Sequence, residues 1–275
     1  MNKKYIDSWL DLALDDLRTS QVLFKESIYP NSFYHFQQAS EKGLKAYAFM
    51  SKLYTSEKDA NKTGHYTLDI FKKAINERKR DITFLNELNF ESLIGEKQLC
   101  EYSSNLNEGL NVIPSKKEVF EYSGQILNEI IAILEELKKY KFSLPENFDS
   151  LFKQKINSFF DLLYELNPKE IERAKEELNL VFEDEKEYKA LKQSIENVLS
   201  NMLNENYHVS ILYFSNLISH NHNNIARYPE IDFNPRKYYN LRKPIIKKLP
   251  VFSNYLNSTL KQLKKWNKIN PTSKN

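Results

Sequence analysis

The chain has 275 residues, of which 41% are hydrophobic and only five are glycine, so it buries an apolar core of one or two domains and favours long helices over a β-rich fold. Its single cysteine, Cys100, excludes an intramolecular disulfide and fits a reducing compartment. The polar N-terminus lacks the apolar region of a secretion signal, and no apolar run approaches the roughly 20 residues that span a bilayer. We therefore expect a cytoplasmic all-α protein that does not enter a membrane.

Positive charge is concentrated near the C-terminus. No acidic residue follows Asp232, but eleven Lys or Arg do, and since the whole chain carries +3, residues 1–232 carry −8. Such a basic segment, interleaved with aromatic residues, attracts phosphates or an acidic partner. The alternative is a solvated helix face whose charge balances the acidic remainder of the molecule.

Hydrophobic spacing predicts a helical hairpin at the start of the chain. Apolar residues from Ile6 to Phe24 recur on one stripe and predict a helix over about 4–27. Pro30 is expected to break the chain before a second helix over about 32–53. On the inward stripe of that second helix, Ser40 and Gly43 are small enough to let another helix approach closely.

Further helices are expected along the rest of the chain. A polar loop over 55–64 precedes a third helix over 65–76, and additional helices are predicted over about 116–140, 147–165, from 168 onward, and 185–217. A proline- and aromatic-rich loop then leads to a final helix over about 251–266. We predict a core formed by 1–78 and 205–268, a helical insertion at 79–204, and a disordered tail at 269–275.

Two motifs carry a family resemblance. The first predicted helix contains Trp9, Ala13, Asp16 and Leu17. The second contains an aromatic residue, two glutamines, an acid–base pair and a Leu-Lys-Ala sequence, which are Phe36, Gln37, Gln38, Ala39, Glu41, Lys42, Leu44, Lys45 and Ala46. This pattern resembles the first two helices of HEPN domains, an all-helical fold of many nucleotide- and RNA-linked prokaryotic proteins. The segment 225–230, with its Ala-Arg-Tyr-Pro-Glu sequence, and the closing helix resemble a later part of the family.

The resemblance implies an all-α, HEPN-like antiparallel helical bundle with an added helical subdomain. It also implies that polar residues of the second helix are candidates for binding. On the second helix, one stripe holds Gln37, Glu41 and Lys45, and a neighbouring stripe holds His35, Gln38 and Lys42. Glutamine suits a nucleobase edge and lysine suits a phosphate. The predicted nucleotide-, RNA- or partner-binding residues are Gln37, Gln38, Glu41, Lys42, Lys45, His65 and Tyr228. The alternative is a Glu–Lys helix pair with amides that bond the adjacent helix.

A histidine cluster supplies candidate catalytic residues. HEPN ribonucleases use an arginine followed four to six residues later by a histidine, with the histidine transferring protons and the arginine stabilising negative charge. All five histidines of this chain precede Arg227, so that order is absent. A reversed arrangement makes His220, His222 and Arg227 the candidate catalytic residues of a metal-independent ribonuclease. The competing interpretation is that the cluster caps the preceding helix and turns the chain.

The resemblance implies a HEPN-type module of a prokaryotic stress or defence system, of the toxin–antitoxin kind, that binds nucleotide or RNA and, if it is an enzyme, cleaves RNA. It also implies a homodimer and a small nucleotidyltransferase as a partner. No cofactor and no metal site is expected, since no Cys/His cluster has the spacing of a zinc site. The second hypothesis is a non-catalytic dimerisation or scaffold protein that binds a nucleotidyltransferase or another protein.

Overall fold

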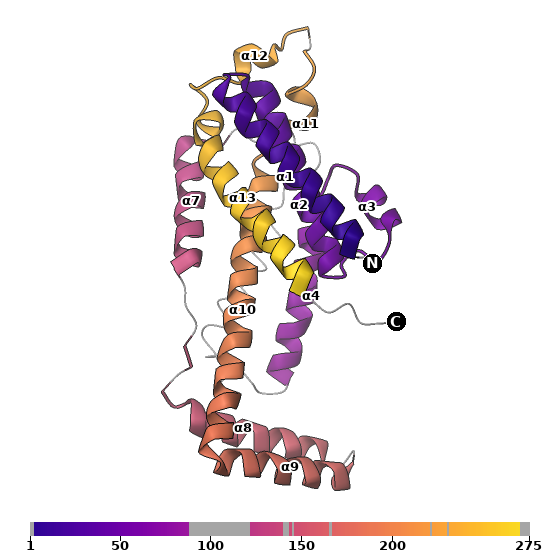
Figure 1. Ribbon diagram of the computed structural model, residues 1–275, viewed down its shortest axis with the longest axis vertical. Helices are drawn as coiled ribbons and strands as arrows, with labels where there is room; N and C mark the ends of the chain where they lie inside the picture. The colour runs from indigo at the N-terminus through magenta and orange to yellow at the C-terminus, as the bar shows by residue number, and fades with distance from the viewer. Residues whose placement is uncertain are drawn as a thin grey trace. The chain divides into compact units, whose positions relative to one another are not determined.

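The computed structural model describes residues 3–87, 122–139, 143–144, 146–164, 167–220, 222–229 and 231–269. These residues form helices and no strand (Figure 1), so the all-α prediction is confirmed over the part of the chain that the structure describes. They divide into two units. The first comprises the described residues within 1–75, 110–138 and 207–275, and the second those within 76–109 and 139–206.

The first unit begins with the predicted hairpin, formed by α1 (Lys3–Lys25) and α2 (Tyr29–Met50), which lie side by side (Figure 1). The two helices meet where Ser20 and Ser32 each donate a hydroxyl hydrogen bond to the other's backbone carbonyl, at 2.7 and 2.8 Å. Ser32 therefore lies in the helix interface and does not begin the helix. The predicted start near 32 was wrong because Pro30 lies in the first turn of α2, where its missing N–H is harmless.

The predicted loop over 55–64 contains a further helix, α3 (Glu57–Thr63). Its start is fixed by Asp59, whose carboxylate accepts the backbone N–H of Ser56 at 2.9 Å, an acidic version of the capping box. Gly64 ends the helix with φ of 58°, a left-handed conformation that glycine adopts without strain. The loop prediction was wrong because the segment was interpreted from its polar composition, although one of those polar side chains, Asp59, caps a helix. The next helix, α4 (Leu68–Glu87), begins later and runs further than expected.

The remaining helices of the first unit complete its core. They are α7 (Gly124–Lys139), the end of α10 (Glu185–Leu217), α11 (His222–Ile225), α12 (Pro235–Tyr238) and α13 (Pro244–Ile269). The bounds of α10 are those predicted from sequence. The last helix begins well before the predicted 251, because Ile246 and Leu249 are buried and their packing outweighs the single backbone hydrogen bond that Pro250 removes.

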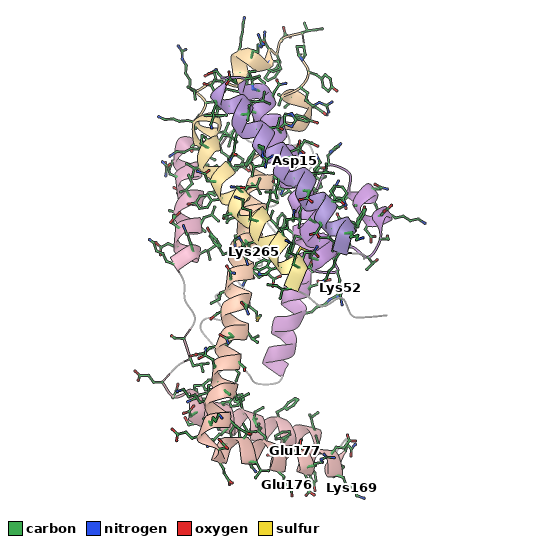
Figure 2. All side chains as sticks on the ribbon, in the orientation of Figure 1. Asp15, Lys52, Lys169, Glu176, Glu177 and Lys265 are labelled. Carbon is green, nitrogen blue, oxygen red and sulfur yellow. The ribbon has the colours of Figure 1, made fainter. Side chains whose placement is uncertain are left out.

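The second unit contains α8 (Phe148–Leu163), α9 (Pro168–Glu183) and the first part of α10. The rings of Phe152 and Tyr188 both pack edge-on against Phe182, with centroids 6.1 and 5.4 Å away. The outer side of α9 is charged and includes exposed Lys169 and Glu176 (Figure 2). The insertion at 79–204 stays a prediction. Residues 116–121, 140 and 165 of the expected helices, and 270–275 of the expected tail, lie outside the described residues.

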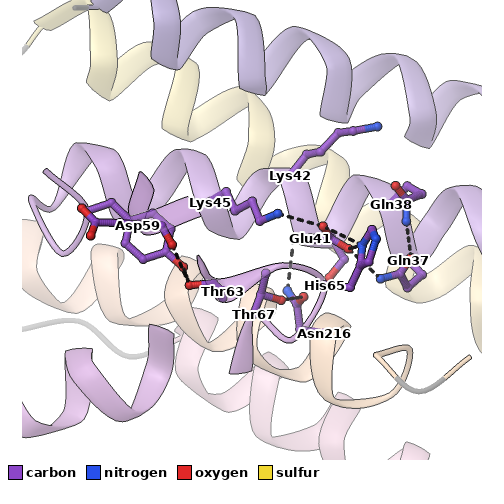
Figure 3. Close-up of polar contacts among 12 residues, drawn as sticks. Gln37, Gln38, Glu41, Lys42, Lys45, Asp59, Thr63, His65, Thr67 and Asn216 are labelled. Atoms are coloured by element: carbon purple, nitrogen blue, oxygen red, sulfur yellow. Dashed lines mark hydrogen bonds and ion pairs between the residues drawn. The ribbon is translucent and has the colours of Figure 1, made fainter. Parts of the chain in front are cut away.

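Two residues at the centre of the first unit explain how closely its helices approach. A Cβ atom at Gly43 would lie 2.6 Å from Leu260 Cδ2 and 3.3 Å from Leu212 Cδ2, which confirms the close approach predicted at this glycine. Nearby, the buried Asn216 amide donates to the Ser40 carbonyl at 3.1 Å. Its oxygen accepts the Thr67 hydroxyl at 2.7 Å (Figure 3). One amide thus joins α2, α10 and the segment before α4.

Replacing Gly43 with alanine is expected to lower the free energy of unfolding by about 1 kcal/mol. Alanine favours the helix by about 1 kcal/mol, but its methyl group overlaps Leu260 and Leu212, and overpacking of a core costs about 1–3 kcal/mol. Urea denaturation measures the change. Gly124→Ala is the matched control, because its Cβ would meet only Pro244, at 3.8 Å. A Gly43→Ala protein as stable as the Gly124→Ala protein would contradict this packing.

Candidate functional site

One stripe of α2 remains accessible, while the rest of the helix between Pro30 and Phe49 is buried. Its accessible positions are Asn31, Tyr34, His35, Gln38 and Lys42. They are spaced three or four residues apart and therefore share one side of the helix. We call this stripe the α2 face. Two carboxylates, one from α1 and one from α2 itself, bind the polar side chains on and beside the α2 face.

The first carboxylate belongs to Asp16 of α1, and it binds two side chains of the α2 face. His35 Nδ1 lies 2.9 Å from its Oδ1, and Lys42 forms an ion pair with its Oδ2. Burial raises the pKa of the Asp16 carboxyl, but the hydrogen bonds from His35 and Lys42 outweigh that effect and hold the pKa below its usual value. Since an ionised carboxylate only accepts hydrogen bonds, His35 Nδ1 carries the proton and donates it.

The second carboxylate belongs to Glu41, which is 4% exposed. It accepts hydrogen bonds from Gln37 Nε2 at 3.1 Å, Lys45 Nζ at 3.0 Å and His65 Nδ1 at 3.0 Å (Figure 3). Gln37 in turn accepts a bond from the accessible Gln38, at 2.7 Å. The structure therefore buries Gln37, Glu41 and Lys45 beneath the surface. In contrast, the side chain of His65 is 67% exposed and is held at the surface by its bond to Glu41.

An arginine and two tyrosines lie at the N-terminal end of the α2 face. The Arg227 guanidinium carbon is 4.9 Å from the ring centroids of both Tyr34 and Tyr228. Tyr228 is 55% exposed, and Tyr34 packs edge-on against His35 with centroids 5.2 Å apart. Exposed aromatic rings and guanidinium planes are surfaces on which nucleobases stack. The geometry thus places a stacking platform beside the polar groups of α2.

The two histidines of the predicted catalytic cluster lie in the interior. His220 is 8% exposed, and its Nδ1 bonds the Leu217 carbonyl at the end of α10, at 3.1 Å. Burial lowers the pKa of His220, although the bond to Leu217 opposes the shift. His222 is 5% exposed, with Nδ1 2.7 Å from the Tyr239 hydroxyl. The third member of the predicted cluster, Arg227, is exposed, so the structure separates an accessible cation from two buried imidazoles.

Much of the predicted basic segment lies on α13. Lys264 forms an ion pair with Asp11 of α1, and the bond to that carboxylate raises the pKa of Lys264. Other cations of the helix, including Lys261 and Lys265, are exposed. Lys265 is labelled in Figure 2. One part of the basic segment therefore neutralises acidic residues of the same unit, and the other part remains available to a partner.

Two residues of this site, Tyr34 and Asp16, are not among the binding residues predicted from sequence. Tyr34 lies on the same stripe as Gln38 and Lys42, and the spacing alone could have identified it. Asp16 was part of the family pattern, but its contact with His35 and Lys42 depends on how α1 and α2 align. The spacing of residues within a single helix cannot predict how α1 and α2 align with each other.

One protein-family model matches part of the chain. The model described as HEPN domain matches residues 6–137, from α1 to α7. No curated protein and no solved structure matches the chain at a significant level. No helix in the described ranges combines the length and hydropathy that a bilayer crossing requires. Among the same residues, no group of three or more His, Cys, Asp or Glu is arranged to hold a metal ion.

Proposed function

Because the HEPN-domain family model matches residues 6–137 and that family is linked to nucleotides and RNA, we propose that the protein is a HEPN-type module of a prokaryotic stress or defence system that binds single-stranded RNA or nucleotide. The observation that carries the proposal is the α2 face, where a stacked arginine lies beside accessible imidazole, amide and ammonium groups.

The accessible groups match the parts of a single-stranded nucleic acid. Tyr228 offers a ring face to a base, with Arg227 against the ring, and Lys42 offers an ammonium to a phosphate. Gln38 carries both a donor and an acceptor for a base edge. Of the seven residues predicted from sequence, we assign direct binding to Gln38, Lys42, His65 and Tyr228. We assign Gln37, Glu41 and Lys45 the role of supporting that surface from below.

Replacing Tyr228 with alanine is expected to weaken binding of single-stranded RNA by about tenfold, since one base–aromatic stack contributes about 1–3 kcal/mol. Fluorescence anisotropy with a labelled 12-nucleotide RNA measures the affinity. Tyr164→Ala is the matched control, because Tyr164 is an exposed tyrosine (42%) of the second unit. If both variants bind RNA equally well, the proposed platform is wrong. If the wild-type protein binds neither RNA nor nucleotide, the scaffold hypothesis replaces this proposal.

The match to the HEPN-domain family model also supports a proposal about the assembly and role of this protein. We propose a homodimer, a small nucleotidyltransferase as the partner, and a role of the toxin–antitoxin kind. Light scattering during size-exclusion chromatography tests the homodimer. Co-expression with the product of a neighbouring nucleotidyltransferase gene tests the partner, and a partner that elutes separately contradicts it.

RNA cleavage by His220, His222 and Arg227 stays a prediction, and the burial of both imidazoles argues against it because a catalytic imidazole must reach the substrate. A cleavage assay on Arg227→Ala, His220→Asn and His222→Asn proteins tests it. Cleavage at the wild-type rate by all three variants would contradict the assignment.

A further inference from the structure

We propose that the first unit attaches to an anionic lipid surface through the segment from Ile231 to Lys248, which we call the basic corner. This segment contains α12 and the first turn of α13. It holds six lysines and arginines but a single acidic residue, Asp232. Because the whole chain carries +3, all residues outside the corner together carry −2. The attachment is separate from the proposed binding of RNA.

Most cations of the basic corner are accessible and carry no counter-ion. The exposed ones are Arg236, Lys237, Arg242 and Lys247. Within the described residues none of these four forms an ion pair, whereas Lys264, further along α13, is paired with Asp11. An anionic bilayer attracts such cations, and each one near its surface strengthens binding by about fivefold.

The backbone of the basic corner is held in place. Asn234 caps α12 by accepting the backbone N–H of Arg236 at 2.9 Å. Asn240 accepts the backbone N–H of Arg242, also at 2.9 Å. Tyr239, which is 1% exposed, packs against a phenylalanine ring of α2 with centroids 5.5 Å apart. Binding therefore requires little further ordering of the backbone that carries the cations.

Exposed aliphatic side chains accompany the cations. Ile231 is fully exposed, and Leu241, which directly precedes Arg242, is 53% exposed. Ile28, in the turn between α1 and α2, is 37% exposed. Figure 1 shows α12 and the first turn of α13 at the same end of the first unit as that turn. Such side chains gain free energy when they leave water for the apolar boundary of a bilayer.

This combination favours a lipid surface over a nucleic acid. RNA offers phosphates to the cations, but its bases stack on aromatic rings and guanidinium groups and not on aliphatic side chains. The tyrosines of the corner are covered, since Tyr239 is buried and Lys243 Nζ lies 4.2 Å from the ring centroid of Tyr238. An anionic bilayer offers both headgroup phosphates and an apolar layer beneath them. Attachment of this kind needs no helix that crosses the bilayer.

The test is co-sedimentation of the full chain with vesicles of equal parts phosphatidylglycerol and phosphatidylcholine, and with vesicles of phosphatidylcholine alone. The wild-type protein is expected to bind the anionic vesicles and to stay in solution with the neutral ones. Added salt is expected to release it, because ions screen exposed charges. Binding to neither kind of vesicle, or to both equally, overturns the proposal.

A double variant tests the cations. Replacing Arg242 and Lys247 with glutamine is expected to lower the partition into anionic vesicles by about 30-fold. The matched control replaces Lys261 and Lys265, two exposed cations of the same helix, with glutamine. Lys261 lies about 21 Å of helix rise beyond Lys247, which is about twice the screening length at 0.1 M salt. The control is therefore expected to bind as the wild-type protein does, and an equal loss in both double variants overturns the role of the corner.

A second variant tests the aliphatic contact. Ile231→Ser is expected to lower the partition by about tenfold, because an isoleucine no longer enters the apolar boundary. Leu180→Ser is the matched control, since Leu180 is a 65% exposed aliphatic residue of the second unit. An Ile231→Ser protein that binds anionic vesicles as well as the wild-type protein overturns the assignment to a lipid surface.

Two further measurements keep the outcomes distinct. Circular dichroism is recorded for every variant, and if one of them is misfolded the other decides. The affinity for a labelled 12-nucleotide RNA is measured with the same proteins. If the Arg242 and Lys247 double variant loses RNA binding but keeps its binding to anionic vesicles, the basic corner contacts RNA and the attachment to lipid is overturned. Loss of vesicle binding with unchanged RNA affinity supports the attachment.

Discussion

Replacing Glu41 with leucine is expected to lower the free energy of unfolding by about 3–5 kcal/mol. The carboxylate is 4% exposed and accepts hydrogen bonds from Gln37, Lys45 and His65. Without it, the ammonium of Lys45, a residue that is only 7% exposed, loses its counter-ion, and the Gln37 amide loses its acceptor. A buried charge that is left unpaired costs far more than a neutral group of the same size.

The double variant Glu41→Leu, Lys45→Met separates this charge effect from packing. It removes both members of the ion pair and is expected to recover most of the lost stability in urea denaturation, because replacing a buried ion pair with apolar residues is close to neutral. Asp69→Ala is the matched control, since Asp69 and its partner Lys72 have side chains that are 45% and 42% exposed. That exposed pair is expected to contribute less than about 1 kcal/mol. An equal loss in Glu41→Leu and Asp69→Ala would show that burial of the Glu41 pair is unimportant.

Lowering the pH from 7 to 4 is expected to reduce the free energy of unfolding by about 3 kcal/mol through His208 alone. His208 is 7% exposed, bonds the Thr259 hydroxyl at 2.9 Å and packs against the edge of Trp266. Burial lowers the pKa of His208 to about 4, whereas an unfolded histidine has a pKa of about 6.5. Between these values the unfolded chain binds a proton that the folded protein does not, so stability falls as the pH falls.

Urea denaturation at pH 7, 6, 5 and 4 measures this dependence. The variant His208→Gln keeps a group that can bond Thr259 but does not titrate, so its stability is expected to change less over the same range. The lowered pKa of His220 acts in the same direction. Asp16, whose pKa is also lowered, loses its contribution only as the pH falls below about 4. Identical pH curves for the wild-type and His208→Gln proteins would contradict the role of His208.

Helical periodicity predicted most of the first unit. The spacing of apolar residues placed the α1–α2 hairpin and the bounds of α10, and the small side chain at Gly43 predicted a close helix approach. Prolines were the main source of error at helix ends. Pro30 lies in a first turn and Pro250 lies inside a helix whose neighbours are buried, and in both places tertiary packing decides the outcome.

The candidate site was less predictable. Residue spacing shows which side chains share one side of a helix, but it does not show whether other helices bury that side. Gln37, Glu41 and Lys45 do share one side of α2, but other elements bury that side. The pairing of Asp16 with His35 and Lys42 joins two helices, and the bond of His65 to Glu41 depends on the turn before α4. Such contacts follow from the alignment of separate segments and cannot be read from local spacing.

The Asn216 amide has a consequence for the order in which this protein forms. It joins residues 176 positions apart in the chain at Ser40 and 149 apart at Thr67. Asn267 similarly donates to the Lys3 carbonyl, 264 positions away, at 3.1 Å. The partners of the N-terminal hairpin lie far along the chain, so they are synthesised long after the hairpin has left the ribosome. During synthesis its apolar stripe has no native partner, and completion of the first unit awaits translation of α13.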